Sequence, residues 1–80
     1  MDNESKINHV SLLKLGNKKS FRFIFDHYHQ RVYGFAFKIT KSQVLSEEIT
    51  SDVFIKLWKK RESLDFNYDL IQILYKITKD

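Results

Sequence analysis

The side chains best suited to metal binding or acid–base chemistry in this sequence are His27, His29, Glu47 and Glu48. On a helix, with about 100° per residue, His27 and His29 point about 200° apart and cannot share a metal ion. Glu47 and Glu48 are neighbours, so their carboxyl groups diverge and do not form an acid and base pair. The chain has no cysteine and no glycine-rich phosphate loop. We find no catalytic group of residues, and the sequence favours a binding domain over an enzyme.

Charged and apolar residues are segregated along residues 45–61, which contain no glycine or proline. As a helix, this stretch gathers its apolar residues into two adjacent stripes, which are Ile49, Val53 and Leu57, and Phe54 and Trp58. The opposite arc carries acids before bases, in the order Glu48, Asp52, Lys56 and Lys59. This order suits the helix dipole. On the pattern alone, a solvated surface and a charged binding surface stay equally open.

Residues 18–40 predict the helix against which that apolar face packs. Their apolar positions recur at steps of three and four, which is typical of an amphipathic helix; they are Phe21, Ile24, Phe25, Tyr28, Val32, Phe35 and Ile39. Gly34 lies inside this pattern and predicts a bend or a close helix contact. We expect Phe54 and Trp58 to pack against this helix.

Capping signals separate the helices. Gly16 suits a left-handed position after a short helix over residues 9–15 that buries Val10, Leu12 and Leu13, and Asn17 is a good N-cap for the next helix. Ser42 caps the helix over residues 45–61. Asp69 caps a last helix over residues 70–79, whose apolar side carries Leu70, Ile73, Leu74 and Ile77. The sequence therefore predicts an all-α fold, a compact bundle of three larger helices plus a short N-terminal helix.

Composition limits the class of protein. The 80 residues are 42% hydrophobic with a net charge of +4, enough apolar residues for one small core. No apolar run approaches the roughly 20 residues of a membrane span, and the polar start is not a signal peptide. We expect residues 1–8 to be flexible, residues 9–80 to form one domain, and the protein to be soluble and cytoplasmic, with no cofactor.

Three segments, in order, resemble region 2 of bacterial sigma-70-family sigma factors, and most closely those of the extracytoplasmic-function group. The run LSEEITSDVFIKLW, residues 45–58, is similar to the family signature, with Ser51 where glutamine is usual. Upstream, LGNKKSF at residues 15–21 is similar to the family's helix entry. Downstream, LIQILYKITKD at residues 70–80 is similar to its last helix, although Ile73, Thr78 and Asp80 replace the usual Trp, Ala and Asn.

The resemblance implies two partners and a set of contacts for each. Region 2 binds core RNA polymerase through the clamp helices of the β′ subunit, and the matching residues here are Glu48, Ser51, Asp52 and Lys56. It also recognises and melts the promoter −10 element and holds the non-template strand as single-stranded DNA, with a flipped base in a loop pocket. The corresponding residues are Lys59, Lys60, Arg61, Leu64, Phe66, Tyr68, Lys76 and Asp80. Residues 62–69 are expected to be a mobile loop that orders around the base. An anti-sigma factor is a further implied partner.

Two features leave alternatives open. Asp80 cannot donate a hydrogen bond when ionised and would repel phosphate, so its effect and that of Ile73 on −10 specificity stay open. Nothing in the 80 residues resembles region 4, the second DNA-binding domain of such factors, so we expect either an excised domain or a stand-alone fragment. The competing hypothesis is a small helical protein–protein interaction module without DNA binding, whose basic residues only aid solubility.

Overall fold

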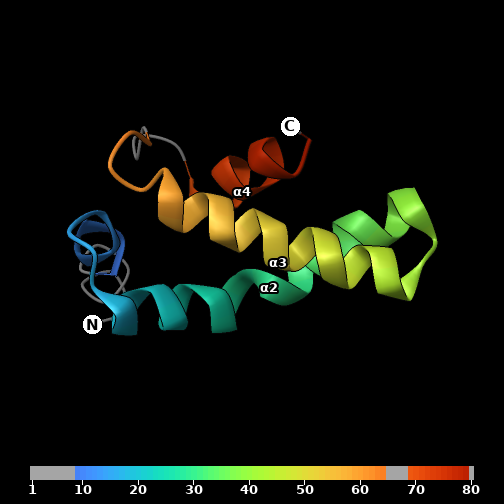
Figure 1. Ribbon diagram of the computed structural model, residues 1–80, viewed down its shortest axis with the longest axis horizontal. Coiled ribbons are helices and arrows are strands. Elements are labelled where there is room, and N and C mark those ends of the chain that lie inside the picture. The colour runs from blue at the N-terminus through green and yellow to red at the C-terminus, as the bar shows by residue number, and fades with distance from the viewer. Residues whose placement is uncertain (1–8, 65–68, 80) are drawn as a thin grey trace.

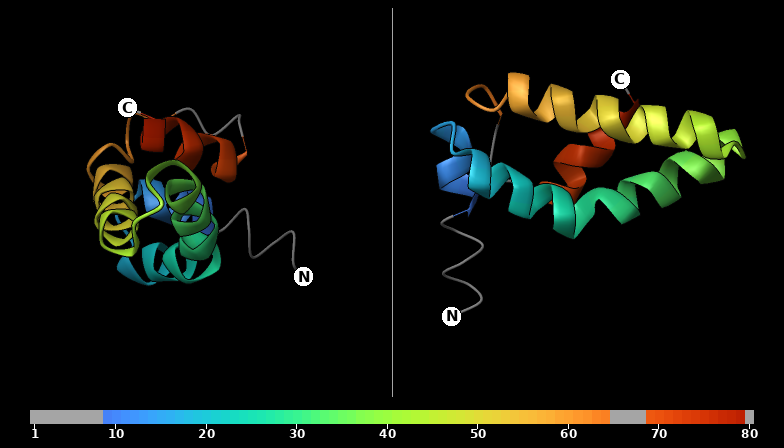
Figure 2. Two further views of the ribbon diagram at one scale, coloured as in Figure 1. Left: turned by 90° about the vertical axis from the view of Figure 1, so that its right-hand side faces the viewer. Right: turned by 60° about the horizontal axis from the view of Figure 1, so that its bottom comes forward.

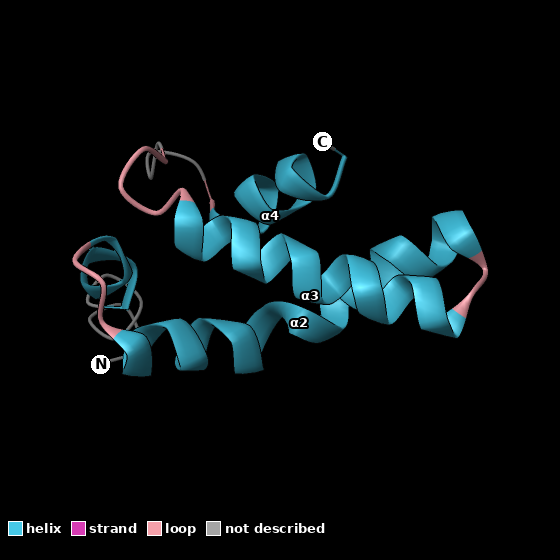
Figure 3. Ribbon diagram, in the orientation of Figure 1, coloured by secondary structure: helices cyan, strands magenta, loops and turns pink. Residues whose placement is uncertain are grey.

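The computed structural model describes residues 9–64 and 69–79, and all regular structure in these ranges is helical. Residues 9–14 are helical and are followed by α2 (Lys18–Thr40), α3 (Gln43–Lys59) and α4 (Leu70–Lys79) (Figure 1, Figure 3). The predicted all-α fold with three larger helices is confirmed. The expectation of a flexible start at residues 1–8 and the candidates Phe66, Tyr68 and Asp80 lie outside the described residues.

Capping side chains begin α2 and α3, as the sequence predicts. Asn17 accepts a hydrogen bond from the backbone N–H of Ser20 at 2.9 Å, directly after Gly16 with φ +89°. Ser42 accepts from the N–H of Leu45 at 3.2 Å and caps α3. The predicted bounds 45–61 for this helix were wrong by two residues at each end. The first backbone N–H groups of a helix have no acceptor within the helix. The Ser42 hydroxyl accepts from one of them, the N–H of Leu45, which makes Ser42 the N-cap and Gln43 the first residue of the helix.

The three larger helices pack around one apolar core. α2 and α3 form an antiparallel pair, and α4 packs against both of them (Figure 1, Figure 2). The core brings together buried side chains from all four helical segments, which are Leu13, Ile24, Val32, Val53, Phe54, Leu57, Ile73, Leu74 and Ile77. Burial of this apolar surface is the main stabilising contribution to such a small domain.

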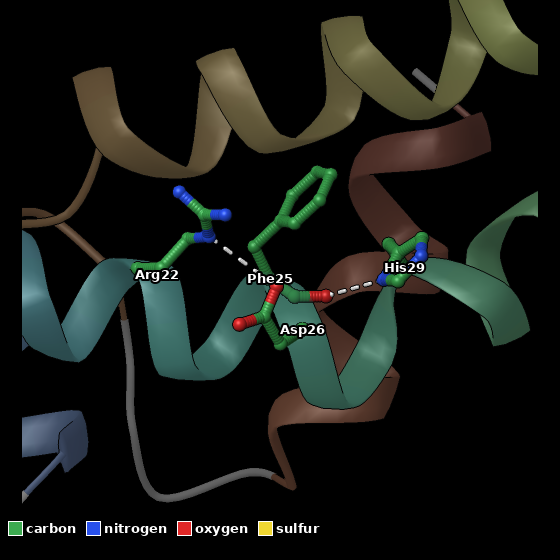
Figure 4. A network of polar contacts seen from close by, with 4 residues as sticks. All are labelled: Arg22, Phe25, Asp26 and His29. Atoms are coloured by element: carbon green, nitrogen blue, oxygen red, sulfur yellow. Dashed lines mark hydrogen bonds and ion pairs between the residues drawn. The ribbon is translucent and has the colours of Figure 1, made fainter.

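Aromatic pairs join α2 to α3 and confirm the predicted packing of Phe54 and Trp58. The rings of Phe25 and Phe54 meet edge to face at 4.9 Å, and those of Phe21 and Trp58 at 5.2 Å. Figure 4 shows the Phe25 ring directed from α2 toward α3. Edge-to-face pairs add about 0.5–1.5 kcal/mol beyond the burial of area. The α2–α3 contact therefore fixes the rotation of both helices about their axes.

The short leading helix is tied to α2 by a stack of three rings. His9 lies 3.8 Å from the ring of Phe23, whose other neighbour in the stack is His27 at 4.2 Å. Nδ1 of His9 lies 3.1 Å from the buried hydroxyl of Ser20. Leu13 from the same segment is fully buried, as predicted, whereas Val10 and Leu12 are half-buried.

Ile39 was wrongly predicted to belong to the buried face of α2. It is 66% exposed, and Ala36 is buried instead, together with Ser46 and Thr50 of α3. These are small residues near the two-residue connection between the helices, where α2 and α3 converge and α4 does not reach (Figure 1). Small side chains let the two backbones approach, while the larger Ile39 points away. Hydroxyls of Ser46 and Thr50 donate to carbonyls one turn earlier, at 2.6 and 2.7 Å, so they are not left unsatisfied.

Gly34 makes no close helix contact, so one of the two alternatives offered for it was wrong. A Cβ at this position would meet nothing within 4 Å, although Figure 2 shows that α2 does bend near its middle.

Gly34→Ala is therefore expected to stabilise the protein by about 1 kcal/mol, because alanine restricts the unfolded chain and suits a helix interior. Urea denaturation followed by circular dichroism measures this change. A loss of stability would mean that the open space beside Gly34 is occupied in solution.

Candidate functional site

The outer face of α3 presents the residues expected to bind a basic partner. Glu48, Ser51 and Asp52 are exposed, and Lys56 is half-buried. Oδ2 of Asp52 lies 3.1 Å from Nζ of Lys56, one turn later. Exposed ion pairs with this spacing contribute about 0.3–0.5 kcal/mol, so a partner's cation can replace Lys56 at little cost. We call Glu48, Ser51, Asp52 and Ile55 the α3 outer face.

Ile55 is the member of this face that sequence reasoning missed. It is 51% exposed and lies three residues after Asp52 and seven after Glu48, which puts all three on one side of the helix. Val44, one turn before Glu48, is also exposed. The signal was present in the sequence, because Ile55 falls outside both apolar stripes of this helix. Apolar groups beside charged ones are what a docking surface offers a partner.

The cations at the end of α3 do not all share one environment. Lys59 and Lys60 are exposed, and so is Lys76 on α4. Arg61 is half-buried: its guanidinium carbon lies 4.2 Å from the centre of the Trp58 ring, and Nη1 donates to the backbone carbonyl of Trp58 at 2.9 Å. Leu64, also a predicted DNA contact, is half-buried and packs against the core. Arg61 and Leu64 thus have packing roles that the motif did not indicate.

Arg61 also holds the turn after α3 against the turn before α2. A Cβ on Gly16 would lie 3.4 Å from Nη2 of Arg61, so the guanidinium rests on that glycine. Nε of Arg61 is buried and finds no hydrogen-bond acceptor within the described residues. The side chain therefore closes α3 by bonding one of its last carbonyls and by covering Trp58.

Arg61→Ala is expected to destabilise the protein by about 1–2 kcal/mol, because it removes a cation–π contact and a bond to a helix-end carbonyl. Lys60→Ala, at the exposed neighbouring position, should change stability by less than about 0.5 kcal/mol. Chemical denaturation of both variants measures the difference. Equal effects would mean that the Trp58 contact contributes nothing to folding.

The histidines near the middle of α2 stack on phenylalanine rings. Nδ1 of His29 donates to the carbonyl of Phe25 at 2.8 Å, and the two rings stack at 4.7 Å (Figure 4). His27 instead stacks on Phe23. Within residues 9–64 and 69–79, no three histidine or acidic side chains are grouped to hold a metal ion. None of the helices in the same ranges has the length and hydropathy to cross a membrane.

Comparison with known proteins identifies the family. The family described as Sigma-70 region 2 matches residues 24–79, which include the α3 outer face, the cations after it and α4. Searches of curated proteins and of solved structures returned no match. The match covers more than half of the 80 residues and includes two of the three segments that carry the motif resemblance, residues 45–58 and residues 70–79, whereas residues 15–21 lie before it. The chain therefore belongs to the sigma-70 region 2 family.

Proposed function

We propose that this chain acts as region 2 of an extracytoplasmic-function sigma factor, binding core RNA polymerase and recognising and melting the promoter −10 element. Its family is one of non-enzymatic transcription initiation factors. The extracytoplasmic-function group is proposed from the motif resemblance. The observation that carries the proposal is the exposed acidic face of α3 in a chain of this family.

The polymerase contact is proposed for the α3 outer face together with Lys56. Glu48 and Asp52 lie one turn apart and are both exposed, so they can meet the cations of a helical partner such as the β′ clamp helices. Ile55 lies beside them and offers apolar area at the same contact. Complementary charge raises the association rate and fixes the register, while desolvated apolar area contributes affinity.

The DNA contact is proposed for the other end of α3 and for α4. Lys59, Lys60 and Lys76 are exposed cations that can follow the phosphates of the non-template strand. Phe66 and Tyr68 are proposed to stack on an unpaired base, which is worth about 1–3 kcal/mol per base. We also propose that the protein is located in the cytoplasm of a bacterium, because bacterial transcription takes place in that compartment. An anti-sigma factor is proposed as a further partner.

The test is a titration of the fluorescently labelled chain with bacterial core RNA polymerase. We expect saturable binding that an unlabelled sigma factor containing region 2 displaces, because both proteins would occupy the clamp helices. Binding that the competitor does not displace would place the chain elsewhere on the polymerase. No binding at all would favour the plain interaction module.

A further inference from the structure

Exposed basic residues from two separate helices lie at the same end of the bundle. The start of α2 and the end of α3 lie side by side there (Figure 1, Figure 2), as the contacts of Phe21 with Trp58 and of Gly16 with Arg61 require. Lys18, Lys19 and Arg22 of α2 are exposed, as are Lys59 and Lys60 after Trp58. We call these five residues the basic end. Its α2 members lie before the residues that match the family, 24–79.

An open depression with an aromatic floor lies within the basic end. It is lined by Lys18, Phe21, Arg22 and Trp58, and most of its exposed surface is apolar. Phe21 and Trp58, whose rings meet edge to face, are its aromatic lining, which we call the floor, and Lys18 and Arg22 are its two cations. Arg22 also pairs with Asp26 at 3.4 Å, but both side chains are strongly exposed and the pair is weak (Figure 4).

The two lysines at the start of α2 are unfavourable for the stability of the helix. Lys18 and Lys19 occupy the first turn, which contains no acidic residue. Cations near the positive end of the helix dipole are unfavourable, and acids are preferred there. Residues that disagree with their local structure are expected where function requires them. Lys18 and Lys19 therefore lower the stability of α2 slightly while placing positive charge at this end of the bundle.

We propose that the basic end extends the DNA-binding surface onto α2: Lys18, Lys19 and Arg22 bind phosphates of the single strand that Lys59 and Lys60 engage, and one nucleobase rests on the Phe21–Trp58 floor. Single-stranded nucleic acid suits this surface because it offers phosphates for the cations and an apolar ring face for the floor. Duplex DNA keeps its bases stacked inside. An acidic protein segment would meet the cations but would leave the aromatic floor unused. The inference rests on the DNA part of the proposed function.

Trp58 is the only tryptophan in the chain and reports on the floor directly. The test is a titration of the full chain with a −10-like DNA single strand, following both the anisotropy of a label on the DNA and the fluorescence of Trp58. We expect binding that quenches Trp58 and weakens as the salt concentration rises. An abasic strand should still bind but should not quench. Equal binding and quenching by duplex DNA or by polyglutamate would overturn the inference.

The decisive variant is Lys18→Glu/Lys19→Glu, with Lys38→Glu/Lys41→Glu as the matched control. Both pairs are exposed, both variants have the same net charge, and the control pair lies at the opposite end of α2. For the first variant we expect lost quenching and a salt slope smaller by about 1.4, at about 0.7 for each of two lost phosphate contacts on a single strand. Its Tm should be equal or higher, because acids suit the start of a helix. The control should keep its quenching.

The outcomes separate this inference from the proposed function. If the unmodified chain binds the strand without quenching, or if both variants lose the same affinity, the inference is wrong while DNA binding itself stands. If the unmodified chain binds no single strand even at low salt, both the inference and the DNA part of the proposed function are wrong.

Discussion

Phe54→Ala is expected to destabilise this protein by about 3–5 kcal/mol, the typical result of removing a phenylalanine from a core. Phe54 is only 2% exposed, and its ring meets that of Phe25 across the α2–α3 contact. Native domains typically have a free energy of unfolding of about 5–15 kcal/mol, so the loss is a large fraction of the total. The expected fall in Tm is at least about 12 °C, at roughly 4 °C per kcal/mol.

Phe37→Ala provides a matched control for that measurement. The same atoms are removed from α2, but Phe37 is 41% exposed and its ring contact is with Tyr33 on the same helix. We expect a loss of less than about 1 kcal/mol. Thermal denaturation followed by circular dichroism compares the two variants. If they melted at the same temperature, the core would not lie where α2, α3 and α4 meet.

Reversing both acids of the α3 outer face, Glu48→Lys/Asp52→Lys, is expected to weaken binding to core RNA polymerase by about 3 kcal/mol, or roughly a hundredfold in Kd. The proposed partner surface is basic, so the variant replaces attraction with repulsion at two positions. Both side chains are exposed, and only the weak pair with Lys56 is lost. The fold should therefore be unaffected, with a Tm close to that of the unmodified chain.

The control for this variant is Asp26→Lys/Glu62→Lys. It reverses one aspartate and one glutamate, both exposed, and its aspartate also pairs with a cation one turn away, Arg22. The net charge of the two variants is the same, so a general charge effect would weaken both equally. We expect the control to bind polymerase like the unmodified chain. Loss of stability in Glu48→Lys/Asp52→Lys would show instead that these acids support the fold.

Periodicity and capping residues predicted that the three larger helices exist and gave the bounds of two of them. The bounds of α2 and α4 follow from Asn17, from the apolar steps of three and four, and from the position of Asp69. These signals are local, because a cap needs only residues three positions away. Both bounds of α3 were predicted two residues too late, and the contacts of Arg61 just after its end, with the Trp58 carbonyl and with Gly16, include one that is distant in the sequence.

Periodicity does not say how many neighbours cover a helical face. Ile39 continues the apolar steps of α2 yet is exposed, because only α2 and α3 occupy that end of the bundle (Figure 1). The basic end could not be predicted either, because it depends on which helix ends lie side by side in the fold. Lys18 and Lys59 are far apart in the sequence, and the packing of Phe21 on Trp58 brings the start of α2 and the end of α3 together. Motif resemblance, which follows chain order, predicts DNA contacts after α3 but gives no indication of the cations at the start of α2.

Promoter recognition is the central claim, and selection by the chain bound to core RNA polymerase tests it most directly. A pool of DNA single strands with a randomised segment would be bound by this complex and, in parallel, by core polymerase alone. We expect the complex to enrich one defined sequence, and we expect Phe66→Ala/Tyr68→Ala to abolish that enrichment while polymerase binding persists. A pool indistinguishable from that selected by core polymerase alone would contradict a role in reading the −10 element.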